Sequence, residues 1–391
     1  MQITKSERPH IAIFGCINSG KSSVINAITN QDLAIVSDVK GTTTDPVLKS
    51  MELLPLGPVV IIDTAGINDT TDLGQLRIEK TKEVLNKTDI AILVIDSTVG
   101  ETEFDRKMIE EFETKKIPYL IVHNKSDLIE NFDENKTYIS AKTGTGINEF
   151  KEKLANIFQT NKKEKVIIKD KIHSGDKIIL VTPIDESAPK GRLILPQQMV
   201  LRELLDAHAI TTCVQLEELE SAIEIIKPTL VIVDSQVFNQ AMKIVPNNIL
   251  LTSFSILMAN YKGDLEVLVK GAEKISQLKS GNKVLISEGC THHRQCKDIG
   301  TVKLPNWIKE FTKANLEFEF TQGGDFPNDL SKYALIVHCG GCMLNDAEMK
   351  SRIERAKEQG IGIVNYGITI SYMNGILKRA LEVFKSDQVI K

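Results

Sequence analysis

The feature that most constrains the fold of this 391-residue chain is a phosphate-binding loop near its N-terminus. An apolar run, 10–14, leads directly into residues 15–22, which read G-C-I-N-S-G-K-S, and a helical pattern follows. This G-x-x-x-x-G-K-S motif has the preceding strand and the following helix that it requires. Backbone N–H groups can surround phosphates there, while Lys21 supplies charge and Ser22 offers a hydroxyl to Mg²⁺. The loop predicts an α/β domain that binds a nucleotide.

A second apolar run supplies groups for the metal ion and the terminal phosphate. Residues 59–62 read as a buried strand that ends in Asp63-Thr-Ala-Gly66. Asp63 is suited to hold the Mg²⁺ shell, and Gly66 lets a backbone N–H approach the γ-phosphate. This strand end is expected to face the phosphate loop.

A later strand end resembles the guanine-reading N-K-x-D motif of GTPases. The apolar run 119–123 delivers Asn124-Lys125-Ser126-Asp127, and Ser140-Ala141-Lys142 resembles the supporting S-A-K motif. A carboxylate at Asp127 only accepts hydrogen bonds, so it selects the N1 and N2 donors of guanine, a pair that adenine lacks. The order and spacing of all these motifs predict a GTPase domain over residues 1–160.

The switch and hydrolysis residues are expected to follow a potassium-activated pattern. Residues 41–45, G-T-T-T-D, resemble the G-x-T-R-D switch loop, which aligns Thr43 with the Mg²⁺-binding threonine. Residue 67 is isoleucine rather than a water-positioning glutamine, so slow intrinsic turnover is expected. Asn18 stands where potassium-activated relatives bind a K⁺ that neutralises transition-state charge. The predicted nucleotide-binding residues are Asn18, Ser19, Gly20, Lys21, Ser22, Ser23, Asp63, Gly66, Asn124, Lys125, Asp127, Ser140, Ala141 and Lys142; among them and Thr43, the predicted catalytic residues are Lys21, Asn18, Thr43 and Gly66.

The C-terminal third carries two clusters of metal-ligand residue types. Cys290-Thr-His292-His293 and His338-Cys339-Gly-Gly-Cys342 form the pattern C-x-H-x45-H-C-x-x-C, and each cluster follows an apolar run. Loops that leave neighbouring parallel strands meet at one edge of a sheet. The clusters therefore predict a metal site. Thiolates with imidazoles suit tetrahedral Zn²⁺, and three cysteines with a weaker fourth ligand suit a 4Fe–4S cluster, so the residues alone leave both open.

The pattern of the whole chain is α/β with three domains. A charged break at 161–165 begins a predicted linker, 161–176. Alternating strands and helices then fill 177–263, assigned by elimination to dimerisation, and 264–391, which holds the metal site and ends in a helix predicted over 371–383. The expected fold class is a P-loop GTPase domain of the Ras and translation-factor type followed by two smaller α/β domains with parallel sheets.

Composition excludes several classes of protein. The net charge is −4 without a long basic run, which gives sequence-independent binding of nucleic acid little electrostatic support. No signal peptide and no apolar stretch of membrane-spanning length is apparent. These features predict a cytoplasmic protein in which clustered cysteines serve metal or redox chemistry rather than disulfides.

In its combination of motifs the chain resembles the FeFe-hydrogenase maturation GTPases of the HydF type. The resemblance covers all three domains and implies a 4Fe–4S cluster held by Cys290, Cys339 and Cys342. It also implies Mg²⁺- and K⁺-dependent GTP hydrolysis, and a role as scaffold or carrier of a diiron precursor with CO and CN ligands. The implied partners are apo FeFe-hydrogenase, two radical-SAM maturases and a second copy of the chain, as a dimer or tetramer, without nucleic acid or membrane.

The resemblance leaves the fourth cluster ligand and the surroundings of the site open. His292 and His338 match the family's histidines, either as an exchangeable ligand or as hydrogen-bonding neighbours of the ligands. Glu288 and Cys296 are further candidates, together with water or an exogenous ligand. Arg294 is expected to attract an anionic cargo. The main alternative is a potassium-type GTPase that acts on tRNA or the ribosome and carries structural zinc; a plain redox enzyme lacks a flavin or nicotinamide motif.

Overall fold

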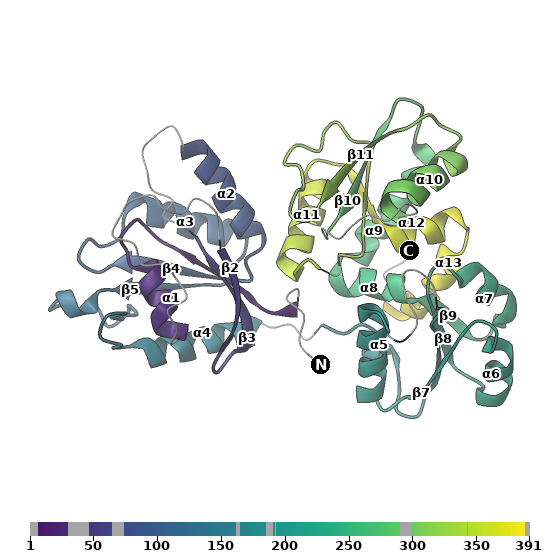
Figure 1. The fold of residues 1–391 in the computed structure, drawn as a ribbon, viewed down its shortest axis with the longest axis horizontal. Coiled ribbons are helices and arrows are strands. Elements are labelled where there is room, and N and C mark those ends of the chain that lie inside the picture. Colours follow the sequence, from purple (N-terminus) through teal and green to yellow (C-terminus); the bar gives the residue numbers. More distant parts are fainter. Residues whose placement is uncertain are drawn as a thin grey trace. The chain divides into compact units, whose positions relative to one another are not determined.

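The computed structural model describes residues 7–29, 47–64, 74–161, 165–184, 191, 193–289, 299–341 and 343–387 (Figure 1). The chain forms two compact units. The first comprises residues 1–163 with the short segment 345–348, and the second comprises residues 164–344 and 349–391.

The first unit is built on a five-stranded sheet in the order β2-β3-β1-β4-β5. All neighbouring strands are parallel except β2, which runs antiparallel to β3. The strands are β1 (His10–Phe14), β2 (Val47–Leu53), β3 (Gly57–Asp63), β4 (Ile90–Asp96) and β5 (Tyr119–Asn124). The helices are α1 (Lys21–Thr29), α2 (Gly74–Asn86), α3 (Glu103–Thr114) and α4 (Ile147–Asn161), and a 3-10 turn, η2 (Ser126–Leu128), follows β5.

Strand β1 shows why this sheet is covered on both faces. Side chains alternate across a strand, and all five residues of β1 are buried. Ile11 and Ile13 belong to a core shared with α1 and α4. Ala12 and Phe14 belong to the core on the other face, shared with α2 and α3. A continuous apolar run such as this is typical of parallel strands between two helical layers.

The second unit contains two four-stranded parallel sheets with the same order of connection. They run β7-β6-β8-β9 and β11-β10-β12-β13, so in each the first strand lies between the second and the third. The strands are β6 (Lys177–Val181), β7 (Ile210–Val214), β8 (Leu230–Val233), β9 (Leu250–Ser253), β10 (Lys283–Glu288), β11 (Glu317–Gln322), β12 (Leu335–His338) and β13 (Gly362–Asn365). One continuous hydrophobic core includes residues of both sheets. This architecture and that of the first unit confirm the predicted fold class.

Helices and short turns connect these strands (Figure 1). The α-helices are α5 (Leu195–Asp206), α6 (Leu219–Ile226), α7 (Phe238–Ile244), α8 (Phe254–Lys262), α9 (Leu265–Glu273), α10 (Leu304–Thr312), α11 (Asp346–Glu358), α12 (Tyr366–Met373) and α13 (Leu377–Ala380). Short 3-10 or π segments are η3 (Lys169–Lys171), η4 (Ile275–Gln277), η5 (Ile299–Lys303) and η6 (Glu382–Asp387).

The last predicted helix is wrong in its bounds. Residues 371–383 do not form one helix, because α12 begins earlier and stops at Met373. Asn365 caps its start by accepting a hydrogen bond from the Ile368 N–H at 2.8 Å. Gly375 then adopts a φ of +70°, a left-handed conformation that ends helices. The shorter α13 and η6 follow.

The second half of the predicted linker 161–176 packs into the second unit. Ile167 and Ile168 are buried in its core, 3% and 0% exposed. The carboxylate of Glu203 on α5 accepts hydrogen bonds from the backbone N–H groups of Ile167, Ile168 and Lys169, at 2.6–3.0 Å. Although this segment is rich in charged residues, two of its residues belong to the core and its backbone is held by Glu203.

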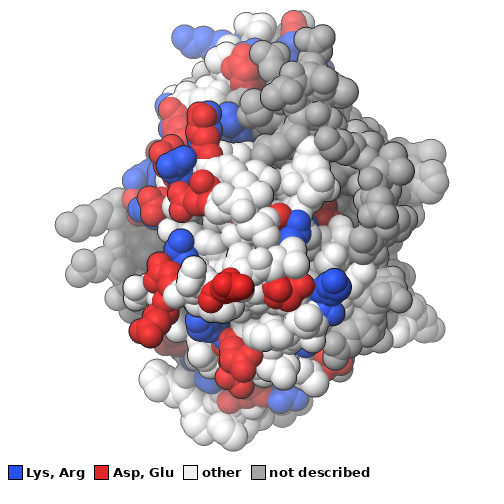
Figure 2. Space-filling view, turned by 90° about the vertical axis from the view of Figure 1, so that its left-hand side faces the viewer, with Lys and Arg blue, Asp and Glu red and all other residues white. Residues whose placement is uncertain are grey.

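Helix composition and surface charge bear on whether the protein binds membranes or nucleic acid. Among the residues that the structure describes, no helix combines the length and the apolarity needed to cross a membrane. Figure 2 shows Lys and Arg side chains interspersed with Asp and Glu on one face of the molecule. Among the described residues on that face, Figure 2 shows no broad basic area of the kind that a nucleic-acid backbone requires.

Candidate functional site

The phosphate loop joins β1 to α1 and needs glycine at two positions. Gly15 has a φ of +148°, and a Cβ there would lie 2.3 Å from the Val94 carbonyl oxygen. Gly20 has a φ of +89°, and a Cβ there would lie 2.2 Å from the side-chain nitrogen of Asn124. The loop therefore passes too close to two other strand ends for any larger residue.

Lys21 folds back across the loop that it follows. Its Nζ donates hydrogen bonds to the carbonyl oxygens of Gly15 and Cys16, both at 2.9 Å. Burial lowers the pKa of Lys21 to about 8, against the opposing influence of Asp63. Burial also raises the pKa of Asp63 at the end of β3, although Lys21 acts to lower it. Both ionised groups are poorly solvated without a ligand, as expected of a site made for phosphates and a metal ion.

Ser19 offers a second sign that the loop is made for a ligand. Its side chain is fully buried, and its Oγ has no hydrogen-bond partner among the described residues. Buried hydroxyls are normally paired, so an orphan within the loop fits a site that nucleotide oxygens or their ions complete. Ser22 and Ser23 lie in the first turn of α1, and Asn18 adopts a left-handed φ of +60°.

The residues predicted to read guanine are assembled by hydrogen bonds from three segments. Asn124, buried at the end of β5, donates to the Ser19 carbonyl at 3.0 Å and accepts from the Ala141 N–H at 3.1 Å. Ser140 donates from its hydroxyl to the Asp127 carboxylate at 2.7 Å. Asn124 thus ties the phosphate loop to the S-A-K segment, and Ser140 orients the carboxylate that would face the base.

Asp96 is a residue of this region that sequence reasoning missed. Lys125, which has a φ of +64°, donates from Nζ to Asp96 at 2.5 Å. Desolvation acts to raise the pKa of Asp96, but hydrogen bonds from Lys125 and Thr98 outweigh it and lower that pKa. The ion pair fixes the Lys125 stem beside the expected base position. The only sign of Asp96 in the sequence is its position directly after the apolar run of β4.

Two predicted GTPase residues fall outside the described part of the chain. These are Thr43, in the predicted switch loop, and Gly66, after Asp63 and Thr64. Their roles at Mg²⁺ and the γ-phosphate stay predictions. The hydroxyl of Thr64, which is described, donates to the carbonyl oxygen of Ile13 and so ties the end of β3 to β1.

The predicted metal-ligand loops begin at neighbouring strand ends. Strand β10 lies between β11 and β12, and Ser287 pairs with His338 in the parallel register. Because the chain leaves β10 toward β11 on one side and β12 lies on the other, this is the point where α/β sheets place their sites. The Cys339 N–H donates to the Ser287 carbonyl at 2.9 Å. Cys339 is thereby held beside the end of β10, at the point in the sheet where a site is expected.

The sulfur of Cys339 lies in a setting that suits a thiolate ligand. Its Sγ accepts N–H hydrogen bonds from Gly289 at 3.0 Å and from Gly341 at 3.4 Å. Gly289 immediately precedes Cys290, so the two predicted ligand loops already meet at this sulfur. Backbone N–H groups directed at sulfur stabilise the negative charge of metal-bound thiolates. The surroundings of this one sulfur therefore fit a metal-bound thiolate, such as a ligand of an iron–sulfur cluster.

Most of the other predicted ligands lie outside the described residues. They are Cys290, His292 and Cys342, as well as the neighbouring Cys296, His293 and Arg294. Within the described ranges no group of three or more Cys, His, Asp or Glu residues is arranged to hold a metal ion. Glu288 is described: it is buried at the end of β10, and Tyr366 donates from its hydroxyl to Oε1 at 3.3 Å.

His338 is fully buried, and protein groups engage both of its ring nitrogens. Nε2 lies 2.9 Å from Nη1 of Arg352, and Nδ1 lies 2.7 Å from the carbonyl oxygen of Cys339. Burial, helped by the charge of Arg352, lowers the pKa of His338 to about 3. The ring is therefore neutral and held beside the loop. Of the two roles left open for this histidine, the contacts favour that of a hydrogen-bonding neighbour.

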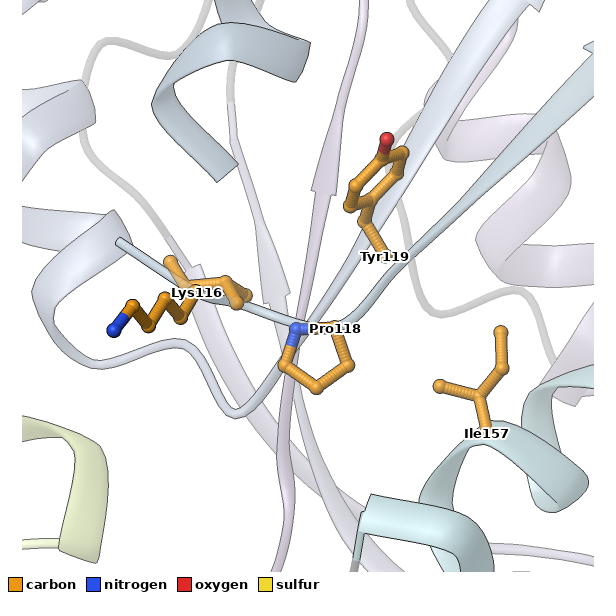
Figure 3. A pocket seen from close by; sticks show the side chains of 5 residues that line it. Lys116, Pro118, Tyr119 and Ile157 are labelled. Carbon is orange, nitrogen blue, oxygen red and sulfur yellow. The ribbon is translucent and has the colours of Figure 1, made fainter. Parts of the chain in front are cut away.

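A shallow pocket in the first unit is not part of either site. It has a volume of about 310 Å³ and is lined by Lys116, Ile117, Pro118, Tyr119 and Ile157 (Figure 3). These residues surround the beginning of β5, whereas Asn124 stands at its end. Strands β1 and β5 run in the same direction in one sheet. The pocket lies at the N-terminal ends of the strands, whereas the phosphate loop lies at their C-terminal ends.

Comparison with known proteins assigns each part of the chain. A family model for 50S ribosome-binding GTPases matches residues 10–125. The model of the hydrogen maturase F dimerization domain matches residues 167–263, and that of the hydrogen maturase F tetramerization domain matches residues 266–383.

Two of the most similar curated relatives each match less than half of this chain. The tRNA modification GTPase MnmE of Desulforamulus reducens is 42% identical over 120 residues, which cover 30% of this chain and 25% of the relative. MnmE of Aquifex aeolicus is 36% identical over 165 residues, 40% of this chain and 36% of the relative. The chain thus spans about a quarter to a third of the length of these relatives.

Among solved structures, the G domain of the FeoB iron transporter from T. maritima matches with a TM-score of 0.31 and 23% identity. It covers 38% of this chain and 98% of that one. The assignment rests instead on the family models, two of which describe successive hydrogen maturase F domains behind a GTPase domain. The chain belongs to the hydrogen maturase F (HydF) family.

Proposed function

We propose that this protein is an FeFe-hydrogenase maturation factor that hydrolyses GTP and carries an iron–sulfur cluster. In this role it delivers the diiron precursor of the hydrogenase active site to apo-hydrogenase. The observation that carries the proposal is the cradle of Cys339, where N–H groups from both predicted ligand loops meet at one sulfur. A guanine-reading constellation in the same chain supplies the nucleotide half.

The GTPase half works by positioning and charge. Backbone N–H groups of the phosphate loop and Lys21 hold the phosphates, while Ser22, Thr43 and Asp63 bind Mg²⁺. Asn18 binds the K⁺ that stabilises charge developing in the transition state. Asp127 receives the guanine donors, with its carboxylate held in place by Ser140.

In the cluster half, Cys290, Cys339 and Cys342 are the three thiolate ligands. A cluster held by these three thiolates would leave a fourth position for an exchangeable ligand, with Glu288, His292 and Cys296 as candidates from the chain, and it would supply a redox-active anchor for cargo. The N–H groups of Gly289 and Gly341 hold the Cys339 sulfur in place. Arg294 attracts the anionic, cyanide-bearing precursor.

The two halves are linked through partner binding. The γ-phosphate orders switch loops in GTPases, and hydrolysis releases them. We infer that the nucleotide state changes docking to apo-hydrogenase and to the two radical-SAM maturases. The chain works as a homo-oligomer, as its dimerization and tetramerization domains imply.

The guanine assignment is tested by changing the base reader alone. In Asp127→Asn, the carboxylate that accepts two guanine donors becomes an amide that offers one acceptor and one donor. GTP affinity is expected to fall at least about tenfold, the effect of roughly 1.4 kcal/mol, and xanthosine triphosphate is expected to bind better than it does to the wild type. Titration with fluorescent nucleotides measures both. Unchanged GTP affinity would reject Asp127 as the base reader.

The carrier role is tested by transfer. Protein loaded with precursor is mixed with apo-hydrogenase, and hydrogen evolution is followed over time. Wild type is expected to activate the hydrogenase, and Cys339→Ala is expected not to. Lys21→Ala, which loses the phosphate-binding charge, is expected to deliver more slowly; delivery at the wild-type rate would refute nucleotide control while leaving the carrier role intact.

A further inference from the structure

A buried arginine joins the carboxyl ends of three neighbouring strands beneath the proposed cluster site. Arg352, on α11, is 2% exposed. Its Nη1 donates to the Ser287 hydroxyl at 3.3 Å, at the end of β10, and lies 2.9 Å from Nε2 of His338, at the end of β12. Its Nη2 donates to the carbonyl oxygen of Gly323, directly after β11. One guanidinium thus contacts the ends of β11, β10 and β12, which lie side by side.

The same guanidinium is packed in a defined orientation. The ring of Phe326 lies 5.1 Å from its central carbon, a distance typical of a cation–π contact. Hydrogen bonds to three strand ends and the contact with this ring leave the guanidinium little freedom to turn. Arg352 is therefore a fixed positive charge, not an adaptable surface side chain.

This contact fixes the hydrogen position on His338. A guanidinium has N–H donors and no acceptor, so Nε2 of His338 must accept. In a neutral imidazole the other nitrogen then carries the hydrogen, and Nδ1 donates to the Cys339 carbonyl at 2.7 Å. The lone pair that would bind iron through Nε2 is directed at Arg352. The ring is a link between the arginine and the backbone of Cys339.

We propose that Arg352 is a positioning residue of the cluster site, which acts through His338 on the Cys339 loop. It holds the imidazole as a hydrogen-bond donor to that loop, and it places one positive charge against His338, the residue that precedes the sulfur ligand. The first part concerns the protein with or without a cluster, and the second rests on the proposed cluster function. A fixed positive charge stabilises the reduced, more negative cluster, so it raises the reduction potential.

The variants separate the role of Arg352 from general damage to α11. Arg352→Met keeps much of the length and removes the charge and the donors, whereas Arg352→Lys keeps the charge and a donor. Arg355→Met is the matched control one turn later on the same helix. Arg355 also packs on Phe326, at 5.6 Å, and donates to the carbonyls of Phe326 and Pro327, not to His338.

The first readout is the tautomer of His338 in the cluster-free protein. Solid-state ¹⁵N NMR of full-length protein labelled at histidine, recorded at pH 7, distinguishes protonated from unprotonated ring nitrogens; a His338→Gln spectrum identifies the signal. Wild type, Arg352→Lys and Arg355→Met are expected to carry hydrogen on Nδ1. Arg352→Met is expected to shift toward hydrogen on Nε2, the form that free histidine prefers. An unchanged tautomer in Arg352→Met would overturn the proposal.

The second readout is the reconstituted cluster. Iron content, the midpoint potential and pulsed EPR of ¹⁵N-histidine protein are measured for each variant. The midpoint potential is expected to fall in Arg352→Met, to stay near wild type in Arg352→Lys, and to be unchanged in Arg355→Met. Strong ¹⁵N coupling to the cluster that His338→Gln abolishes would overturn the proposal, because His338 would then be a ligand. A wild type that takes up no iron would reject the proposed function instead, and the tautomer alone would then decide whether Arg352 fixes His338.

Discussion

At the scale of single residues, Lys21 shows that a binding site can hold a charged group in an unfavourable, poorly solvated position. A buried ammonium is poorly solvated, and two carbonyl oxygens replace only part of its water. The pKa of Lys21 is lowered for this reason, and that of Asp63 is raised for the same reason. Phosphates and Mg²⁺ would relieve both groups. The site is less stable alone than when occupied.

The pH dependence of stability is predicted to reveal this strain. Burial takes the pKa of Lys21 from 10.5 to about 8 in the folded, nucleotide-free protein. Between these values the unfolded chain binds more protons, so the Lys21 contribution to the free energy of unfolding rises with pH, by at most about 3 kcal/mol. Lys21→Met should lose this rise. The exposed Lys82→Met is the control, and equal pH slopes for all three proteins in denaturant titrations would contradict the prediction.

Gly20 is predicted to be intolerant of even one methyl group. Gly20→Ala introduces left-handed strain of about 1–2 kcal/mol and also pushes the Cβ into Asn124. Gly57→Ala is the control: its φ is +85°, but nothing lies within 4 Å of the added Cβ. Both variants should unfold more easily, and only Gly20→Ala should also lose at least about tenfold in GTP affinity, the equivalent of roughly 1.4 kcal/mol. Equal nucleotide binding by both variants would refute the role of the contact.

Sequence reasoning succeeds at this scale where a motif encodes its own local geometry. The phosphate loop was predictable because its glycines and lysine act within eight consecutive residues. The pairing of Lys125 with Asp96 was not, because it joins residues 29 positions apart on separate strand ends. Arg352 was missed for the same reason. Nothing in the helical pattern of α11 indicates that its guanidinium contacts three strand ends.

At the scale of elements, strand order decides what can meet. Apolar runs in the sequence are enough to divide the chain into strands and helices. They do not indicate which strands lie beside β10, and only the structure shows that these are β11 and β12. Parallel pairing of β10 with β12 places the two ligand loops at one edge, as their positions after apolar runs predicted. The predicted linker was less informative. Its lysine-rich composition suggested a segment exposed to solvent, but Ile167 and Ile168 are core residues.

The anchoring of that segment gives a prediction for an element. Glu203→Ala removes the carboxylate that receives the N–H groups of Ile167, Ile168 and Lys169. Hydrogen bonds to charged groups contribute about 1.5–3 kcal/mol each, so these three amides should lose most of their protection from hydrogen exchange. The exposed Glu224→Ala on α6 is the control. Unaltered exchange in Glu203→Ala would show that core packing alone holds the segment.

At the scale of the whole molecule, the domain combination separates this protein from its GTPase relatives. The MnmE protein of Desulforamulus reducens matches 30% of this chain, whereas the two family models that match residues 167–263 and 266–383 are of hydrogen maturase F. The GTPase domain fits either a tRNA-acting enzyme or a maturation factor, whereas the two domains that follow it match models of hydrogen maturase F alone. Net charge agrees, since −4 gives little attraction to an RNA backbone.

Assembly is the prediction that belongs to this scale. The dimerization and tetramerization domains imply a mass in solution of two or four times 43.5 kDa. Light scattering after size-exclusion chromatography, over a hundredfold range of concentration, measures it. Assembly should survive Cys339→Ala, because that side chain lies at the cluster loop. A monomer of wild-type protein throughout the range would contradict the prediction.

The most direct test of the proposed function is the metal content of the purified protein. The chain is reconstituted anaerobically with iron and sulfide, then reduced, and its iron is counted alongside the EPR spectrum. We predict about four irons per chain and the signal of a reduced 4Fe–4S cluster, lost in Cys339→Ala. Tightly held zinc without a cluster would contradict the account: the GTPase would remain, and the cysteine loops would be structural.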